Sequence, residues 1–74
     1  MNLIDIFTQA EKEGVKAVQA TYRKLMRRAI KTGEEAIEQV IDAIDERFRY
    51  YMDFNPEMAH IYDVLCQKAD YHII

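Results

Sequence analysis

The chain has 74 residues, of which half are apolar and 31% are charged. This composition is too apolar for a disordered chain, and the length holds one domain with one core. Because 10 basic and 13 acidic residues give a formal net charge of −3, a general attraction to nucleic acid or anionic lipid is excluded and any anion binding must be local. With two glycines and one proline, helices have few places to stop, so we predict an all-α protein.

The first predicted helix runs from about residue 3 to residue 31. Asn2 is a suitable N-cap, and Asp5 stands in the first turn, where an acid complements the helix dipole. Gly14 and Glu11 complicate the pattern, because the glycine falls on the apolar stripe and the acid projects near it. One helix kinked at Gly14 and two short helices broken there both remain open. The apolar stripe consists of Leu3, Phe7, Ala10, Val18, Tyr22, Leu25 and Ala29.

A change of charge sign at Thr32-Gly33 predicts the first turn. Glycine suits the residue after a helix, and acids are favoured where the next helix begins. Six basic residues and no acid lie between Gly14 and Gly33, and six acids and no base lie between Glu34 and Glu46. We predict that the two helices form an antiparallel hairpin, which would bring Arg27 near Glu38 and Arg23 near Asp42. Such exposed pairs would bias the register more than they hold the fold.

The second and third predicted helices span about residues 34–52 and 56–69. The break at Asn55-Pro56 is expected because asparagine is a good N-cap and proline suits the first helical position. Two apolar stripes follow the helical period. They are Ile37, Val40, Ile41, Ile44, Phe48, Tyr51 and Met52 in the second helix, and Met58, Ile61, Tyr62, Leu65 and Ala69 in the third.

These elements predict a small antiparallel three-helix bundle in which residues 1–74 form a single helical domain. The N-terminus carries an acid within its apolar run and no basic leader, so we expect no signal peptide. No apolar run approaches the ~20 residues that span a bilayer, so we expect no membrane partner. The single cysteine, Cys66, favours a reducing, cytoplasmic setting, because small secreted domains usually carry several.

Enzyme chemistry finds little support in the sequence. Serine is absent, and there is no glycine-rich phosphate loop, HExxH motif or paired-cysteine motif. His60, Asp63 and Cys66 follow an i, i+3, i+6 pattern, but a structural zinc site needs four ligands and no obvious fourth ligand exists unless His72 folds back. We therefore expect no catalytic residues, no cofactor and no metal.

The aromatic segment before the predicted turn at Asn55 suggests a binding site. Residues 47–54 contain four aromatic residues and two arginines, and tyrosine and arginine are enriched in binding hot spots. The apolar C-terminus could belong to the same patch, since chain ends are normally polar. Our leading hypothesis is a non-enzymatic regulator, adaptor or inhibitor that binds a larger protein, or itself as a homodimer. The candidate partner-binding residues are Arg49, Tyr50, Phe54, Tyr71, Ile73 and Ile74.

A nucleic-acid-binding protein is the alternative hypothesis. The first helix would present a basic face made of Lys16, Arg23, Lys24, Arg27, Arg28 and Lys31. These side chains could contact phosphates along about two helical turns. Against this, the following helix is acidic, although a helix-turn-helix protein would insert that helix into the DNA groove.

Overall fold

The computed structural model describes residues 2–73, with side chains described for residues 2–67. Within this range every element is a helix: α1 (Leu3–Glu13), α2 (Val15–Thr32), α3 (Glu34–Phe54) and α4 (Pro56–Ile73). The all-α prediction is confirmed, whereas the prediction of three helices is wrong. The first predicted helix is two helices, and the third extends beyond its expected end.

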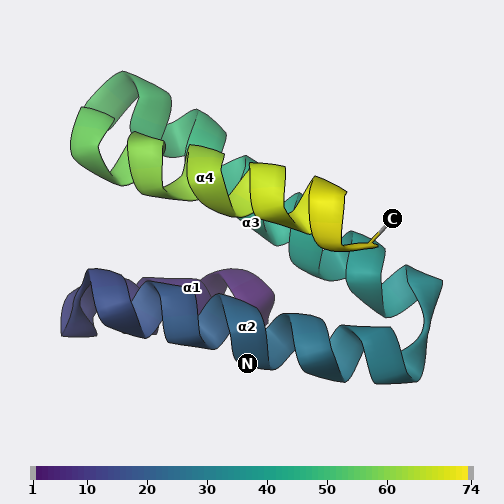
Figure 1. Ribbon diagram of the computed structural model, residues 1–74. Coiled ribbons are helices and arrows are strands. Elements are labelled where there is room, and N and C mark those ends of the chain that lie inside the picture. The colour runs from purple at the N-terminus through teal and green to yellow at the C-terminus, as the bar shows by residue number, and fades with distance from the viewer. Residues whose placement is uncertain (1, 74) are drawn as a thin grey trace.

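Gly14 separates α1 from α2, so the first predicted helix is two helices. Its φ of +121° and ψ of 175° lie in a region that L-residues with a side chain rarely adopt. The chain turns back at this residue, so that α1 packs against α2 instead of extending it (Figure 1). Glycine is therefore required here for its backbone conformation and not for space, since a Cβ atom at this position would meet nothing within 4 Å.

Local signals at the other helix ends agree with the structure. Asn2 Oδ1 accepts a hydrogen bond from the amide of Asp5 at 2.9 Å, and Asn55 Oδ1 accepts one from the amide of Met58 at 3.2 Å. Gly33, with φ +121°, ends α2, and its amide donates to the carbonyl of Ala29 at 2.9 Å. These caps satisfy backbone groups that the helix ends would otherwise leave unpaired.

The helices form two layers. Figure 1 shows α1 and α2 along one side of the molecule, with the α3–α4 hairpin along the other. Single residues join α2 to α3 and α3 to α4, namely Gly33 and Asn55. In each of these two pairs, the helices pack against one another. The Cα radius of gyration is 11.4 Å, close to the value of about 11 Å expected of a compact chain this long.

All four helices contribute to the core. The most deeply buried large side chains come from α1 (Phe7), α2 (Val18), α3 (Ile44) and α4 (Tyr62 and Leu65). Most residues of the predicted stripes are buried or half-buried, as helical spacing requires. Met52 is a correction: it was predicted on the core arc but is 61% exposed, because helical spacing puts it at the outer edge of that arc. Met26 and Ala59 are buried although they were not among the predicted core positions.

No helix in the described part of the chain combines the length and apolarity that crossing a bilayer requires.

Candidate functional site

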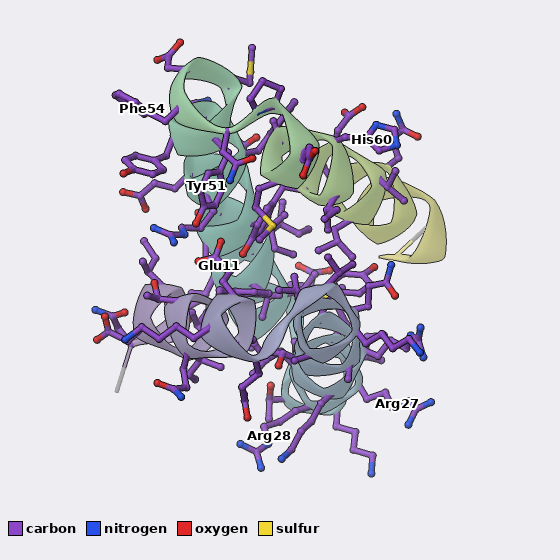
Figure 2. The ribbon with its side chains drawn as sticks, turned by 90° about the vertical axis from the view of Figure 1, so that its left-hand side faces the viewer. Glu11, Arg27, Arg28, Tyr51, Phe54 and His60 are labelled. Atoms are coloured by element: carbon purple, nitrogen blue, oxygen red, sulfur yellow. The ribbon has the colours of Figure 1, made fainter. Side chains whose placement is uncertain are left out.

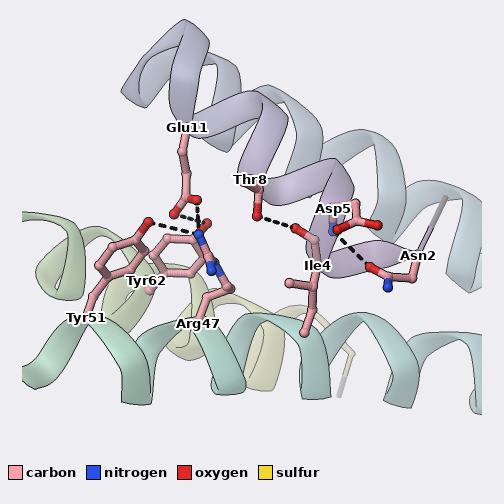
Figure 3. A network of polar contacts seen from close by, with 8 residues as sticks. All are labelled: Asn2, Ile4, Asp5, Thr8, Glu11, Arg47, Tyr51 and Tyr62. Carbon is pink, nitrogen blue, oxygen red and sulfur yellow. Dashed lines mark hydrogen bonds and ion pairs between the residues drawn. The ribbon is translucent and has the colours of Figure 1, made fainter. Parts of the chain in front are cut away.

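A buried polar network joins α1, α3 and α4 (Figure 3). It consists of Glu11, Arg47, Tyr51 and Tyr62. One carboxylate oxygen of Glu11 accepts a hydrogen bond and forms an ion pair with Nη2 of Arg47. The other carboxylate oxygen accepts from the Tyr62 hydroxyl at 3.0 Å. The same guanidinium nitrogen donates to the Tyr51 hydroxyl at 2.9 Å, so four side chains from three helices share one set of hydrogen bonds.

Aromatic rings enclose the network. Tyr51 and Tyr62 stack with their ring centroids 5.7 Å apart, and Phe7 meets Tyr62 edge-on at 6.1 Å. The Arg47 guanidinium also lies over the rings of Tyr51 and Tyr50, at 5.0 and 5.5 Å from their centroids, within the range of a cation–π interaction. The Glu11 side chain is 8% exposed and that of Arg47 is 17% exposed, so the ion pair is largely shielded from water.

This environment perturbs the titration of the network's tyrosines and arginine. Burial, assisted by the Glu11 carboxylate, raises the pKa of Tyr51 to about 12. Burial, with a smaller contribution from the charge and hydrogen bond of Glu11, also raises the pKa of Tyr62 well above its usual range. Burial alone would lower the pKa of Arg47, but the hydrogen bond and charge of Glu11 reverse the effect and raise it. Both phenols are therefore neutral at physiological pH, and the arginine is charged.

The network's polar groups are almost fully occupied by one another. Among residues 2–67, Nε of Arg47 is the one buried side-chain nitrogen or oxygen without a hydrogen-bond partner. The arrangement ties three helices together at one point of the core.

Sequence reasoning placed Glu11 only near the apolar stripe and assigned Arg47 to the aromatic segment. The ion pair between Glu11 and Arg47 could have been predicted from an acid on one apolar stripe and a base on another. Glu11 lies one turn after Phe7, and Arg47 lies between Ile44 and Tyr51. Charges on buried faces require partners.

The predicted partner-binding residues of α3 are all exposed, and we call them together the aromatic corner: Arg49, Tyr50 and Phe54. Tyr50 is 52% exposed and Phe54 is 72% exposed, with their ring centroids 5.0 Å apart. Tyr50 also contacts Tyr51 edge-on at 5.2 Å. Arg49 forms an exposed ion pair with Asp45 at 3.3 Å. In Figure 2 the Phe54 side chain points away from the bundle at the end of α3.

The rest of the predicted patch lies outside the described residues. The side chains of Tyr71, Ile73 and Ile74 fall in that part of the chain, so the structure does not test whether they join the aromatic corner.

The predicted basic residues lie on α2, and we call five of them the basic face: Arg23, Lys24, Arg27, Arg28 and Lys31. All five are exposed, as is Lys16 near the start of the helix. With Ala20, the five line one open hollow on the surface. Figure 2 shows Arg27 and Arg28 pointing away from the bundle on either side of the α2 axis.

The predicted ion pairs between α2 and α3 are a correction. Among residues 2–67 the ion pairs are Glu11–Arg47 and Asp45–Arg49, so neither Arg27–Glu38 nor Arg23–Asp42 forms. Apolar side chains do approach each other across the hairpin, since Leu25 of α2 and Val40 of α3 line one crevice. The charged side chains project outward, into water, and do not meet across the hairpin.

His60 and Cys66 belong to different environments on α4. His60 is exposed and Cys66 is half-buried. Over the described residues, no three His, Cys, Asp or Glu side chains gather closely enough to hold a metal ion.

No family model, no curated protein and no solved structure matches the chain.

Proposed function

We propose that this protein is a non-enzymatic regulator, adaptor or inhibitor in the cytoplasm that binds a partner protein through the aromatic corner. The observation that carries the proposal is the exposure of two large rings that are nevertheless held in place. Tyr50 and Phe54 are at least half exposed, yet each has a ring neighbour on α3. Exposed apolar side chains gathered at one place are typical of interaction surfaces.

The buried network orders the aromatic corner before any partner binds. Arg47 lies under the Tyr50 ring while its guanidinium is fixed by Glu11 on another helix. Fewer rotamers are therefore lost on binding, which favours affinity because side-chain ordering costs about 0.5–1.5 kcal/mol for each residue immobilised. The two rings would enter an apolar pocket, while Arg49 at the rim would meet a polar or acidic group.

Two rings and one arginine are smaller than a stable interface. Specific complexes bury about 800 Å² on each partner, so the aromatic corner would act as the hot spot of a larger contact. We propose that the apolar C-terminus, with Tyr71, Ile73 and Ile74, extends this contact. A homodimer is the second form that the same binding could take, and light scattering would detect it.

The test is capture from a lysate of the native host with a photo-reactive phenylalanine analogue at position 54. The comparison variant is Tyr50→Ala with the analogue retained, and the matched control is Ile30→Ala. Ile30 is 54% exposed on α2, so the control removes a similarly exposed apolar side chain from another surface. We expect a discrete crosslinked partner with the parent and the control, and at least a tenfold loss with Tyr50→Ala, which is about 1.4 kcal/mol of binding.

Two results would contradict the proposal. One is a crosslinking pattern that Tyr50→Ala leaves unchanged, and the other is an equal loss with Ile30→Ala. The melting temperature of each variant checks that it is folded. We expect it to be, because neither Tyr50 nor Ile30 belongs to the core.

A further inference from the structure

The basic face of α2 is an exposed cationic surface that forms no ion pair with the residues whose side chains the structure describes. None of its five residues takes part in the ion pairs of residues 2–67, and α2 itself contains no acid. A protein with a net charge of −3 thus keeps five positive charges together on two turns of one helix. Their mutual repulsion is relieved when an anionic partner binds.

The spacing along α2 produces two parallel rows of charge. Arg23 and Arg27 form one row at i, i+4, and Lys24, Arg28 and Lys31 form the other. At 1.5 Å per residue the basic face spans about 12 Å from Arg23 to Lys31, and about 12 Å of the DNA axis carries three or four phosphates on each strand. The planar guanidinium groups can bind phosphate oxygens in pairs.

Four acidic residues of α3 line hollows other than the one formed by the basic face. Asp42 and Glu46 line a hollow shared with the start of α1, and Glu34 and Glu38 line one formed by α3 residues alone. Neither hollow includes a basic residue of α2. These four acids therefore do not line the hollow that a polyanion would approach.

The form of the basic face favours one kind of polyanion, duplex DNA. Single-stranded nucleic acid is usually held by aromatic side chains that stack on its bases, and the hollow formed by the basic face contains none. The major groove of duplex RNA is too narrow for a helix, whereas that of B-DNA, about 12 Å wide, admits one. An α-helix with its side chains is about 10–12 Å across.

We propose that the basic face of α2 binds the phosphate backbone of duplex DNA, lying along the major groove. Binding is electrostatic and phosphate-directed, and it leaves the aromatic corner on α3 free. Figure 2 shows Phe54 and the pair Arg27–Arg28 at opposite ends of the molecule, so the DNA and a partner protein approach from different sides.

The experiment measures fluorescence anisotropy of a labelled DNA duplex of about two helical turns, roughly 20 base pairs, titrated with the full chain. If all five cations contact phosphates, the logarithm of affinity falls against the logarithm of salt with a slope of about −4.5, or roughly 500-fold between 50 and 200 mM salt. Arg27→Glu should weaken binding and reduce the slope by about 1. Arg23→Glu combined with Arg27→Glu should abolish measurable binding.

Lys12→Glu is the matched control. It changes the net charge by the same amount as Arg27→Glu, but Lys12 lies on α1, outside the hollow formed by the basic face. We expect its salt slope to equal that of the parent. Thermal unfolding checks that the variants fold, which we expect because the substituted side chains are exposed.

Three results would overturn the proposal. The first is no binding of the parent at about 100 μM protein in low salt, near the weak limit of non-specific DNA affinity. The second is binding to single-stranded DNA or duplex RNA at least as tight as to duplex DNA. The third is sedimentation showing an oligomer that Arg27→Glu dissociates, in a protein that binds no DNA, because the basic face would then be occupied by acidic residues of a second copy.

Discussion

A carboxylate in the protein interior needs partners for both of its oxygens, and Glu11 finds them on two other helices. Arg47 of α3 and Tyr62 of α4 each occupy one oxygen. A buried ion pair of this kind is weak evidence for net stability, since desolvation offsets much of the attraction. Removing one partner of the pair is destabilising, because the remaining charge stays in the core without compensation.

We predict that Glu11→Gln lowers the free energy of unfolding by about 3 kcal/mol. Glutamine keeps the size of the side chain and can still accept from Tyr62, but it leaves the Arg47 charge uncompensated. Urea unfolding followed by circular dichroism measures the change. Glu13→Gln, two residues later and exposed, is the control and should change the stability by less than about 0.5 kcal/mol. Equal stabilities for the two variants would show that the ion pair contributes nothing.

At the scale of the helices, the sequence was informative wherever the signal was local. Asn2, Gly33 and Asn55 mark helix ends, and the structure shows each of them acting as a cap. The structure at Gly14 was ambiguous because the apolar stripe continues on both sides of it. Periodicity alone could not distinguish one helix kinked at Gly14 from two helices broken there. The backbone conformation of that one residue decides between them.

The long-range contacts could not be predicted in the same way. Glu11 and Arg47 are 36 residues apart, and their pairing depends on how α1 folds back at Gly14. Exposure of the aromatic corner was predictable from spacing, because Tyr50 lies off the apolar stripe of α3. The expected α2–α3 ion pairs failed because side chains on the outer faces of two adjacent helices diverge into solvent.

We predict that Gly14→Ala destabilises the protein by about 1–3 kcal/mol, the cost of holding a residue with a side chain in a sparsely populated backbone region. No clash contributes, since nothing lies within 4 Å of the added Cβ. Unfolding of a synthetic chain with D-alanine at this position is the control. The D-residue favours positive φ, so it should match or exceed the stability of the parent. If Gly14→Ala were instead more stable than the parent, α1 and α2 would be joining into one continuous helix.

At the scale of the whole molecule, the two surfaces for which we propose binding lie on different helices, and the buried network connects α3 to α1 and α4. The basic face occupies α2, and the aromatic corner stands at the end of α3. The network links α1, α3 and α4, and α1 packs on α2, so disrupting the network loosens every helix together. Deprotonation of its tyrosines should therefore lower the free energy of unfolding of the whole protein.

We predict that stability falls as the pH rises above 10. The pKa of Tyr51 is raised from 10.0 to about 12 and that of Tyr62 is raised further, so the unfolded chain loses these protons first. The stabilisation is complete below pH 10 and is lost as the pH approaches 12, at up to about 1.4 kcal/mol per pH unit for each tyrosine. Urea unfolding between pH 8 and 11 should show this decline, and Tyr51→Phe combined with Tyr62→Phe should flatten it despite lowering the stability at neutral pH. Lysine deprotonation is common to parent and variant, so a decline equally steep in both would assign the alkaline instability to groups outside the network.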